Sequence, residues 1–506
     1  MAPKPARAGG TQDSAARAAA EIRHDENTGC DYCYIRDMKC ALRFMLATVL
    51  VAACSADNGS DGGTAEASPP EAADAAAATN GNTVQEGIER EVTPEVAATD
   101  AAVRDPQADA TPEGPGTEGI DLDRVFVFPR PDHVRGLYVN AWSAGSRRRI
   151  TALTELARRT EINTFVVDIK DATGYVSHPT EVPLAQRIGA TGEIRIPNLR
   201  LLLARLEAAG IYPIARIVIV KDPLIAAAHP ELAVQDTAGG PWSDDKGIVW
   251  LNPYNREVWD YHVAIAREVA EMGFPEIQWD YVRFPDAPAS AMRRAYFPGG
   301  AGVPRPQAIR EFLAYSRAEL ADVDVQVTAD VFGVTTSFNR DVGIGQVWES
   351  FIDVVDVALP MVYPSHYWKG SFGYDRPNSH PYEIVREALE DAVRRSAVIE
   401  GAGATRPWLQ DFTLGPPRYE APEVRAQIQA AYDVGIEEWI LWNPGSRYTE
   451  AALEPAGGFA EEPLMRIADQ VVPVSRRFEF YDTATVIVEP QSTDSAGGRD
   501  GKPSGS

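Results

Sequence analysis

The chain has 506 residues, of which 44% are hydrophobic and 9% aromatic, and this composition excludes a wholly disordered protein. Its 48 Lys and Arg stand against 73 Asp and Glu, which gives a formal net charge of −25. Because nucleic-acid binding needs clustered basic residues, this balance argues against a nucleic-acid partner.

Residues 38–54 have the order of a bacterial lipoprotein signal. Basic residues precede a short apolar run, which ends in the sequence VAAC at residues 51–54. The run is too short to span a bilayer as a helix, and this ending resembles the lipobox, in which the cysteine is lipidated. We therefore expect lipidation at Cys54, a membrane contact through that lipid, and a place in the cell envelope, at the outer rather than the inner membrane. The alternative is a buried apolar helix with an ordinary cysteine.

The composition divides the rest of the chain. On the lipoprotein interpretation, residues 1–37 are an upstream extension. Residues 55–120 are rich in Ala, Asp, Glu, Gly, Pro and Thr and lack aromatic residues, which predicts a disordered acidic linker. Residues 121–475 are predicted to form one folded domain, and residues 476–506 a C-terminal strand and a disordered tail.

Eight short apolar segments predict β-strands. Their cores, such as FVVDI and PIARIVIV, are almost continuously apolar, as in parallel strands that are buried on both faces. The predicted strands cover residues 134–142, 163–171, 211–220, 276–285, 324–333, 355–363, 406–412 and 437–443.

Amphipathic segments lie between these strands, and several end in a glycine just before the next strand. Eight such units in about 350 residues predict a (β/α)₈ TIM barrel. An open doubly wound sheet is the alternative, but it needs a glycine-rich phosphate turn that is absent. We expect a helix over residues 450–470 to close the barrel and a further strand over residues 478–490.

Polar residues gather where the predicted strands end, which is where this fold builds its active sites. An Asp in an apolar strand is costly to bury unless it is paired or functional. Clustered carboxylates raise the pKa of at least one member, which suits acid–base catalysis. Four strands carry an Asp near that end, namely Asp168, Asp280, Asp330 and Asp411.

Three segments resemble a bacterial family of glycoside hydrolases with TIM-barrel domains, long described as a domain of unknown function. They are RGLYVNAW at 135–142, NTFVVDIKDATGYV at 163–176 and QWDYVRFP at 278–285. The DYVRFP run is the most specific part, and the resemblance covers about residues 134–442. It implies a barrel and a carbohydrate substrate, but neither the sugar nor the linkage.

Glycoside cleavage needs one carboxylic acid and one carboxylate. We predict Asp280 as the nucleophile or base, since Arg283 follows closely and a guanidinium favours an ionised carboxylate. We predict Asp330, on the adjacent strand, as the general acid. Asp168 is the reserve candidate, with Lys170 as its ion-pair partner.

Aromatic side chains at the strand ends suit stacking on sugar rings, although core packing is the favoured explanation for any single one. Asp411 and Asn443 are expected to bind substrate hydroxyl groups. The predicted substrate-binding residues are Trp142, Asp168, Lys170, Tyr281, Arg283, Tyr363, Asp411, Trp442 and Asn443.

Two other classes remain open. A non-catalytic carbohydrate-binding or scaffold barrel would use the same aromatic residues. Metal-assisted hydrolysis would need closely spaced His and Asp, but the chain has 7 His and no H-x-x-H or H-E-x-x-H motif. We therefore expect no metal and no cofactor. P-loop and G-x-S-x-G motifs are also absent, and the sequence leaves the oligomeric state open.

Overall fold

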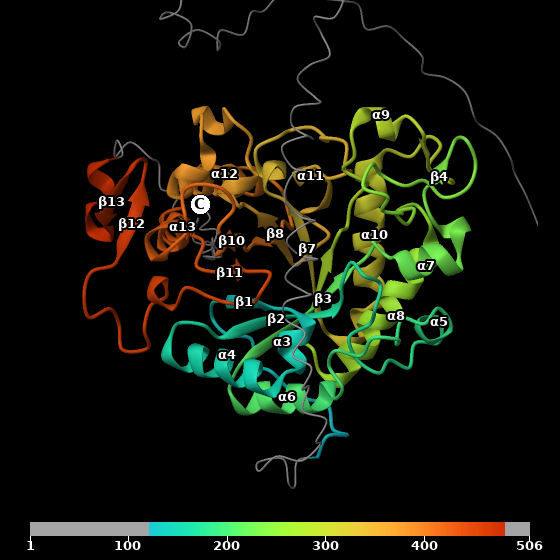
Figure 1. Cartoon of the computed structure of the whole chain (residues 1–506), viewed down its shortest axis with the longest axis horizontal. Coiled ribbons are helices and arrows are strands. Elements are labelled where there is room, and N and C mark those ends of the chain that lie inside the picture. The colour runs from blue at the N-terminus through green and yellow to red at the C-terminus, as the bar shows by residue number, and fades with distance from the viewer. Residues whose placement is uncertain (1–120, 481–506) are drawn as a thin grey trace, which may run out of the picture. The chain divides into compact units, whose positions relative to one another are not determined.

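The apolar segments form a closed ring of parallel strands in the computed structural model, which describes residues 121–480 (Figure 1). Each strand pairs in parallel with the next, and the last pairs with the first. This confirms the predicted (β/α)₈ barrel and its eight strands. They are β1 Arg135–Val139, β2 Thr164–Lys170, β3 Tyr212–Val218, β5 Glu276–Asp280, β7 Gln326–Phe332, β8 Val357–Met361, β10 Trp408–Gln410 and β11 Trp439–Trp442.

One strand of the ring is interrupted. A two-residue strand, β9 (Ala404–Thr405), pairs with β8 just before β10 begins at Trp408. Pro407 stands in the gap, and proline cannot donate a backbone hydrogen bond to a neighbouring strand.

Helices occupy most of the connections and cover the outside of the barrel (Figure 1). Their apolar residues face the strands: in α4, Ile150, Leu153 and Leu156 are buried, as the sequence pattern predicts. The longer helices are α4 Arg147–Arg159, α6 Leu199–Ala208, α8 Arg256–Met272, α10 Arg305–Glu319, α12 Pro381–Ser396 and α13 Ala421–Asp433. The shorter ones are α3 Ala141–Gly145, α5 Pro183–Arg187, α7 Pro223–Ala228, α9 Ala289–Met292 and α11 Trp348–Phe351.

Gly273 ends α8 and turns the chain into β5. Its φ of 117° lies in the left-handed region, and its amide donates to the Val269 and Ala270 carbonyls. A Cβ at this position would lie 2.4 Å from the Phe126 carbonyl oxygen. Only glycine fits this helix end without a shift of the backbone.

The prediction of a closing helix over residues 450–470 is wrong. This region forms a 3₁₀ turn, η7 (Glu450–Ala452), and then the antiparallel hairpin of β12 (Leu464–Ile467) and β13 (Gln470–Pro473). Pro455, the glycine pair at 457–458 and Pro463 interrupt the segment, and each of these residues disfavours a helix interior.

Several predictions fall outside the described residues. The signal at 38–54, the linker at 55–120 and most of the strand over 478–490 belong to this group, while residues 474–479 form the short 3₁₀ helix η8. No helix within residues 121–480 is both long and apolar enough to cross a membrane.

Two long connections meet above the ends of β3 and β5. The β3–α8 connection contains β4 (Gln235–Asp236), and the β5–α10 connection contains β6 (Ala295–Tyr296). These two short strands pair antiparallel, which joins the connections to each other. The first connection thereby holds Trp250 and residues 244–248 beside the strand ends that carry Arg216 and Asp280.

Candidate active site

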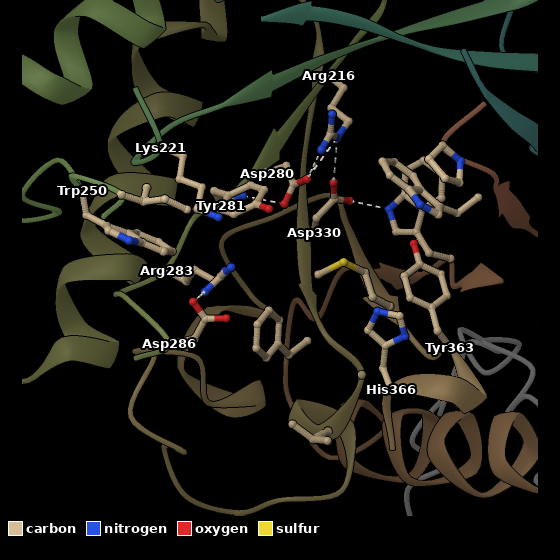
Figure 2. Close-up of a pocket in the computed structure, with 18 of the residues that line it drawn as sticks. Arg216, Lys221, Trp250, Asp280, Tyr281, Arg283, Asp286, Asp330, Tyr363 and His366 are labelled. Atoms are coloured by element: carbon tan, nitrogen blue, oxygen red, sulfur yellow. Dashed lines mark hydrogen bonds and ion pairs between the residues drawn. The ribbon is translucent and has the colours of Figure 1, made fainter. Parts of the chain in front are cut away.

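Arg216 of β3 lies at the centre of a buried carboxylate cluster. Its Nε donates to Oδ2 of Asp280 at 3.0 Å and lies 3.8 Å from Oδ2 of Asp330. One of its terminal nitrogens forms an ion pair with Asp168. Because all four residues are at most 6% exposed, these charges interact in a poorly solvated environment. Figure 2 shows Asp280 and Asp330 pointing toward the same guanidinium.

Asp330 has the surroundings of a carboxyl that holds a proton. Burial, together with the nearby Asp280 carboxylate, raises the pKa of Asp330 well above its usual value, although Arg216 acts in the opposite direction. Gln278 Nε2 donates to both Asp330 oxygens, at 2.9 Å to Oδ1 and 3.1 Å to Oδ2. Trp408 Nε1 also donates to Oδ1, at 2.6 Å. Since Oδ1 accepts the two shorter bonds, Oδ2 is the oxygen better placed to carry the proton.

The backbone after Asp280 is strained. Tyr281 has a φ of 52°, in a region that bulky residues enter at a cost of about 1–2 kcal/mol. Its amide donates to Oδ1 of Asp280 at 2.5 Å. The turn thus orients the Asp280 carboxylate and sends the Tyr281 side chain into the cleft, and strain of this kind is concentrated at functional sites.

Asp168 occupies the neighbouring strand, β2. It accepts a hydrogen bond from the Tyr138 hydroxyl and forms an ion pair with Arg216. Burial raises the pKa of Asp168 to about 6, against the opposing effect of Arg216. Asp168 therefore titrates closer to neutrality than an exposed aspartate.

A cleft opens over this cluster at the carboxyl ends of the strands. It has two adjoining parts, which share the lining residues Arg216, Lys221, Ile248, Tyr281, Trp442 and Pro444. Asp280 and Asp330 line one part, and Asp168 lines the other. The cluster therefore borders a space that a ligand can enter, as expected for the active-site end of a (β/α)₈ barrel.

The four predicted aromatic residues all line the cleft. Trp142 lies in the part beside Asp168, Tyr363 in the part beside Asp330, and Tyr281 and Trp442 in both. One face of Trp442 is already covered, because its ring stacks on Tyr138 with centroids 3.9 Å apart. Trp442 therefore presents its other face or its edge to a ligand.

One ion-pair assignment from the sequence is wrong, and a second residue, Arg283, interacts with the charge of Asp280 but bonds to another carboxylate. Lys170 does not pair with Asp168: it is fully buried, and its Nζ lies 2.9 Å from Asp222 and outside the cleft lining. The strand register shifts between Asp168 and Lys170, so their side chains diverge. Arg283 lines the cleft, but it forms its ion pair with Asp286 at 2.9 Å, and the cation bonded to Asp280 is Arg216.

Asp411 and Asn443 form hydrogen bonds within the protein and do not line the cleft. Asp411 accepts from the Thr449 amide and hydroxyl at 2.8 and 2.7 Å. Asn443 donates to the Asp411 carbonyl and accepts from the Gly445 amide. The two side chains hold the 443–449 loop, and neither lines the cleft described above.

The sequence interpretation assigned no role to three residues of the cluster. Arg216, Gln278 and Tyr138 each place a polar group at a buried strand position. The argument that singled out the aspartates, the cost of burying a polar group at such a position, applies to all three.

No group of three or more His, Cys, Asp or Glu side chains within residues 121–480 is arranged to hold a metal ion. His366 lines the cleft, and burial lowers its pKa to about 4, so its imidazole is neutral at physiological pH.

A sequence model of the family described as "Putative glycosyl hydrolase domain" matches residues 136–448. The chain belongs to this family. The match begins in β1 and ends beyond β11, so this glycosyl hydrolase-like domain contains all eight strands of the barrel and the whole carboxylate cluster. No curated protein matches the chain.

Solved structures also match the chain. A hypothetical protein from Ruminiclostridium thermocellum is 41% identical over 38% of this chain and 97% of that one, with a TM-score of 0.36. The glycoside hydrolase domain of PgaB (BpsB) from Bordetella bronchiseptica is 13% identical over 62% of this chain and 95% of that one, with a TM-score of 0.47. The spore cortex-lytic enzyme SleL from Bacillus megaterium is 12% identical over 64% and 73%, with a TM-score of 0.36.

Proposed function

We propose that the protein is a glycoside hydrolase that cleaves a polysaccharide by a two-carboxylate mechanism. The observation that carries the proposal is the placement of Asp280 and Asp330 against one atom, Nε of Arg216, at the edge of the cleft. Membership of the glycosyl hydrolase family supports the reaction class.

The two carboxyl groups have different surroundings, which suits different roles. Asp330, with its raised pKa, donates a proton to the leaving glycosidic oxygen. Asp280 forms an ion pair with the Arg216 guanidinium and acts as the nucleophile or base. In acid–base catalysis, different surroundings can give two carboxyl groups different pKa values, so that one acts as the acid and the other as the base. The assignment follows this rule.

The spacing of the two carboxyl groups fits a hydrolytic pair. Oδ2 of Asp280 and Oδ2 of Asp330 lie 3.0 and 3.8 Å from the same nitrogen, so their separation cannot exceed the sum of these distances. Retaining enzymes hold the pair about 5–5.5 Å apart, and inverting enzymes about 6.5–9.5 Å apart. The upper bound for this oxygen pair includes the retaining range and the start of the inverting range, so Asp280 is assigned as nucleophile or base.

The aromatic rings that line the cleft would bind the sugar rings. Trp142 and Trp442 border the part beside Asp168, and Tyr363 borders the part beside Asp330. With Tyr281 between them, they offer flat apolar surface on both sides of the carboxylate pair.

We further propose that the domain works in the cell envelope, tethered through a lipid on Cys54, and that its substrate is an envelope or environmental polysaccharide. The VAAC sequence before the acidic linker supports the tether.

The test is a panel of bacterial envelope and plant polysaccharides incubated with the purified chain. We expect new reducing ends from at least one polysaccharide and none from heat-denatured protein. The absence of reducing ends across a panel that covers neutral, amino and acidic sugars would contradict the proposal.

A non-catalytic carbohydrate-binding barrel remains the second candidate. One observation favours it: Asp168 and Asp280 both form ion pairs with Arg216, as carboxylates with a purely structural role also would. Binding of a polysaccharide that never yields reducing ends would support this candidate over the hydrolase.

A further inference from the structure

Lys221 is a buried cation at the cleft without a bonded carboxylate. The residue is 8% exposed and lines both parts of the cleft. Among the described residues, none forms a hydrogen bond or an ion pair with its ammonium group. Nζ lies 5.0 Å from the ring centroid of Trp250 and 4.8 Å from that of Tyr281, and Figure 2 shows Lys221 beside these two rings.

The charges around the cleft divide into two groups. On one side, Arg216 forms ion pairs with two carboxylates, those of Asp168 and Asp280. On the other side, Arg283 and Lys221 share one carboxylate, Asp286. Although burial raises it, these two cations hold the pKa of Asp286 below its usual range. Three further charged residues line the same part of the cleft, namely Asp244, Asp245 and Lys246. Of Arg216, Arg283 and Lys221, only Lys221 lacks a bonded carboxylate among the described residues.

Packing alone does not explain a lysine at this position. Partial removal of an ammonium ion from water has a cost, and cation–π contacts with two rings offset part of that cost. An apolar residue would fill the space beside Trp250 and Tyr281 without this penalty. The charge is accounted for if a negatively charged group enters the cleft and pairs with Nζ.

We infer that Lys221 binds a carboxylate of the substrate, so that the polysaccharide contains an acidic sugar. This inference rests on the proposed function, because it names the substrate class of the same cleft. A single ammonium group balances one negative charge, as on a uronic acid. A phosphomonoester carries nearly two charges, so the nearby Asp280 and Asp286 carboxylates would repel it more strongly than a singly charged carboxylate. A carboxylate is therefore favoured over a phosphate.

The test measures binding apart from turnover, with the full chain carrying Asp280→Asn. The ligands are matched pairs that differ in a carboxylate, namely glucuronic acid with glucose, galacturonic acid with galactose and N-acetylmuramic acid with N-acetylglucosamine. Glucose 6-sulfate and glucose 6-phosphate test whether the site prefers a sulfate or a phosphate to a carboxylate. Ligand-observed NMR titrations give the dissociation constants.

We expect the acidic member of at least one pair to bind about tenfold more tightly, which corresponds to about 1.4 kcal/mol. Lys221→Met should remove this preference, and Lys221→Arg should keep most of it. Lys369→Met is the matched control, because Lys369 is an exposed lysine outside the cleft lining, and it should keep the full preference.

Any of four results would overturn the inference. The acidic and neutral members could bind equally, or no carboxylate could bind. The phosphate or sulfate could bind more tightly, or Lys221→Met could leave the preference unchanged. If Lys221→Met does not fold, the preference must still weaken as salt rises from about 0.05 to 0.5 M, since salt screens a charge pair; no weakening would also overturn it. An acidic preference that depends on Lys221, with no cleavage of any polysaccharide, would refute the proposed hydrolase and leave this inference standing.

Discussion

Arg216 on β3 donates through Nε to Oδ2 of Asp280 on β5, at 3.0 Å. The strands are direct neighbours, and their register sets Arg216 opposite Gln278, two residues before Asp280. Both side chains are nearly buried, with residue exposures of 5% and 6%. The ion pair is therefore a product of the barrel itself, since it joins two strands that are 64 residues apart in the chain.

Replacing Arg216 with Met should destabilise the fold by about 3–5 kcal/mol, the usual cost of leaving a buried charge without its partner. Asp168 and Asp280 would both lose the cation that they share. Urea unfolding followed by circular dichroism measures the change. Arg158→Met is a fitting control, because Arg158 forms an exposed ion pair with Glu155 and its replacement should cost under about 1 kcal/mol. Equal losses in the two variants would argue against the buried cluster.

Asp330→Asn should lower kcat/KM by about 10²–10⁴ on an unactivated glycoside, because the leaving oxygen would lose its proton donor. On a dinitrophenyl glycoside, whose leaving group needs no proton, the loss should be much smaller. In the wild type, activity requires protonated Asp330 and should fall as the pH rises through its raised pKa, and this alkaline decline should vanish in the variant. Similar losses on both substrates would rule out the acid role.

Asp411 should make folding stability depend on pH. Burial raises its pKa to about 6 in the folded chain, while the unfolded value is near 3.8. For a raised pKa, the stabilising contribution is complete below about pH 4 and is lost as the pH rises through about 6. Between pH 4 and 7, the wild type should lose up to about 3 kcal/mol relative to Asp411→Asn. Urea unfolding at both pH values gives this difference, and a constant difference would contradict the shift.

Cys54→Ala should abolish lipidation if residues 38–54 are a lipoprotein signal. The chain produced in a Gram-negative host with radiolabelled palmitate should carry label, and it should partition into the membrane fraction. The variant should carry none. A fair control is Cys40→Ala, which lies outside the VAAC sequence and should keep the label. Label retained in Cys54→Ala would refute the lipid anchor.

The strands and the acidic strand ends could be predicted from the sequence, because burial on both faces leaves a continuous apolar run and makes each aspartate conspicuous. The partners of these aspartates could not. Arg283 is near Asp280 in sequence, yet barrel register brings Arg216 to it. Likewise, the register shift in β2 separates Lys170 from Asp168, and no local pattern reveals such a shift.

The predicted end of a strand was wrong where the backbone conformation changed, and one predicted helix did not form. The strand expected over residues 276–285 stops at Asp280, because Tyr281 adopts a positive φ. The prediction of a helix over residues 450–470 did not take into account the prolines and the glycine pair in that segment, although the sequence shows them.

The most direct test of the central claim compares the wild type with Asp280→Asn on one polysaccharide that the wild type cleaves. If Asp280 is the nucleophile or base, the rate of reducing-end release should fall by at least about 10²-fold, while circular dichroism and binding of the same polysaccharide show a folded protein with an intact cleft. A folded variant that releases reducing ends at the wild-type rate would contradict the account.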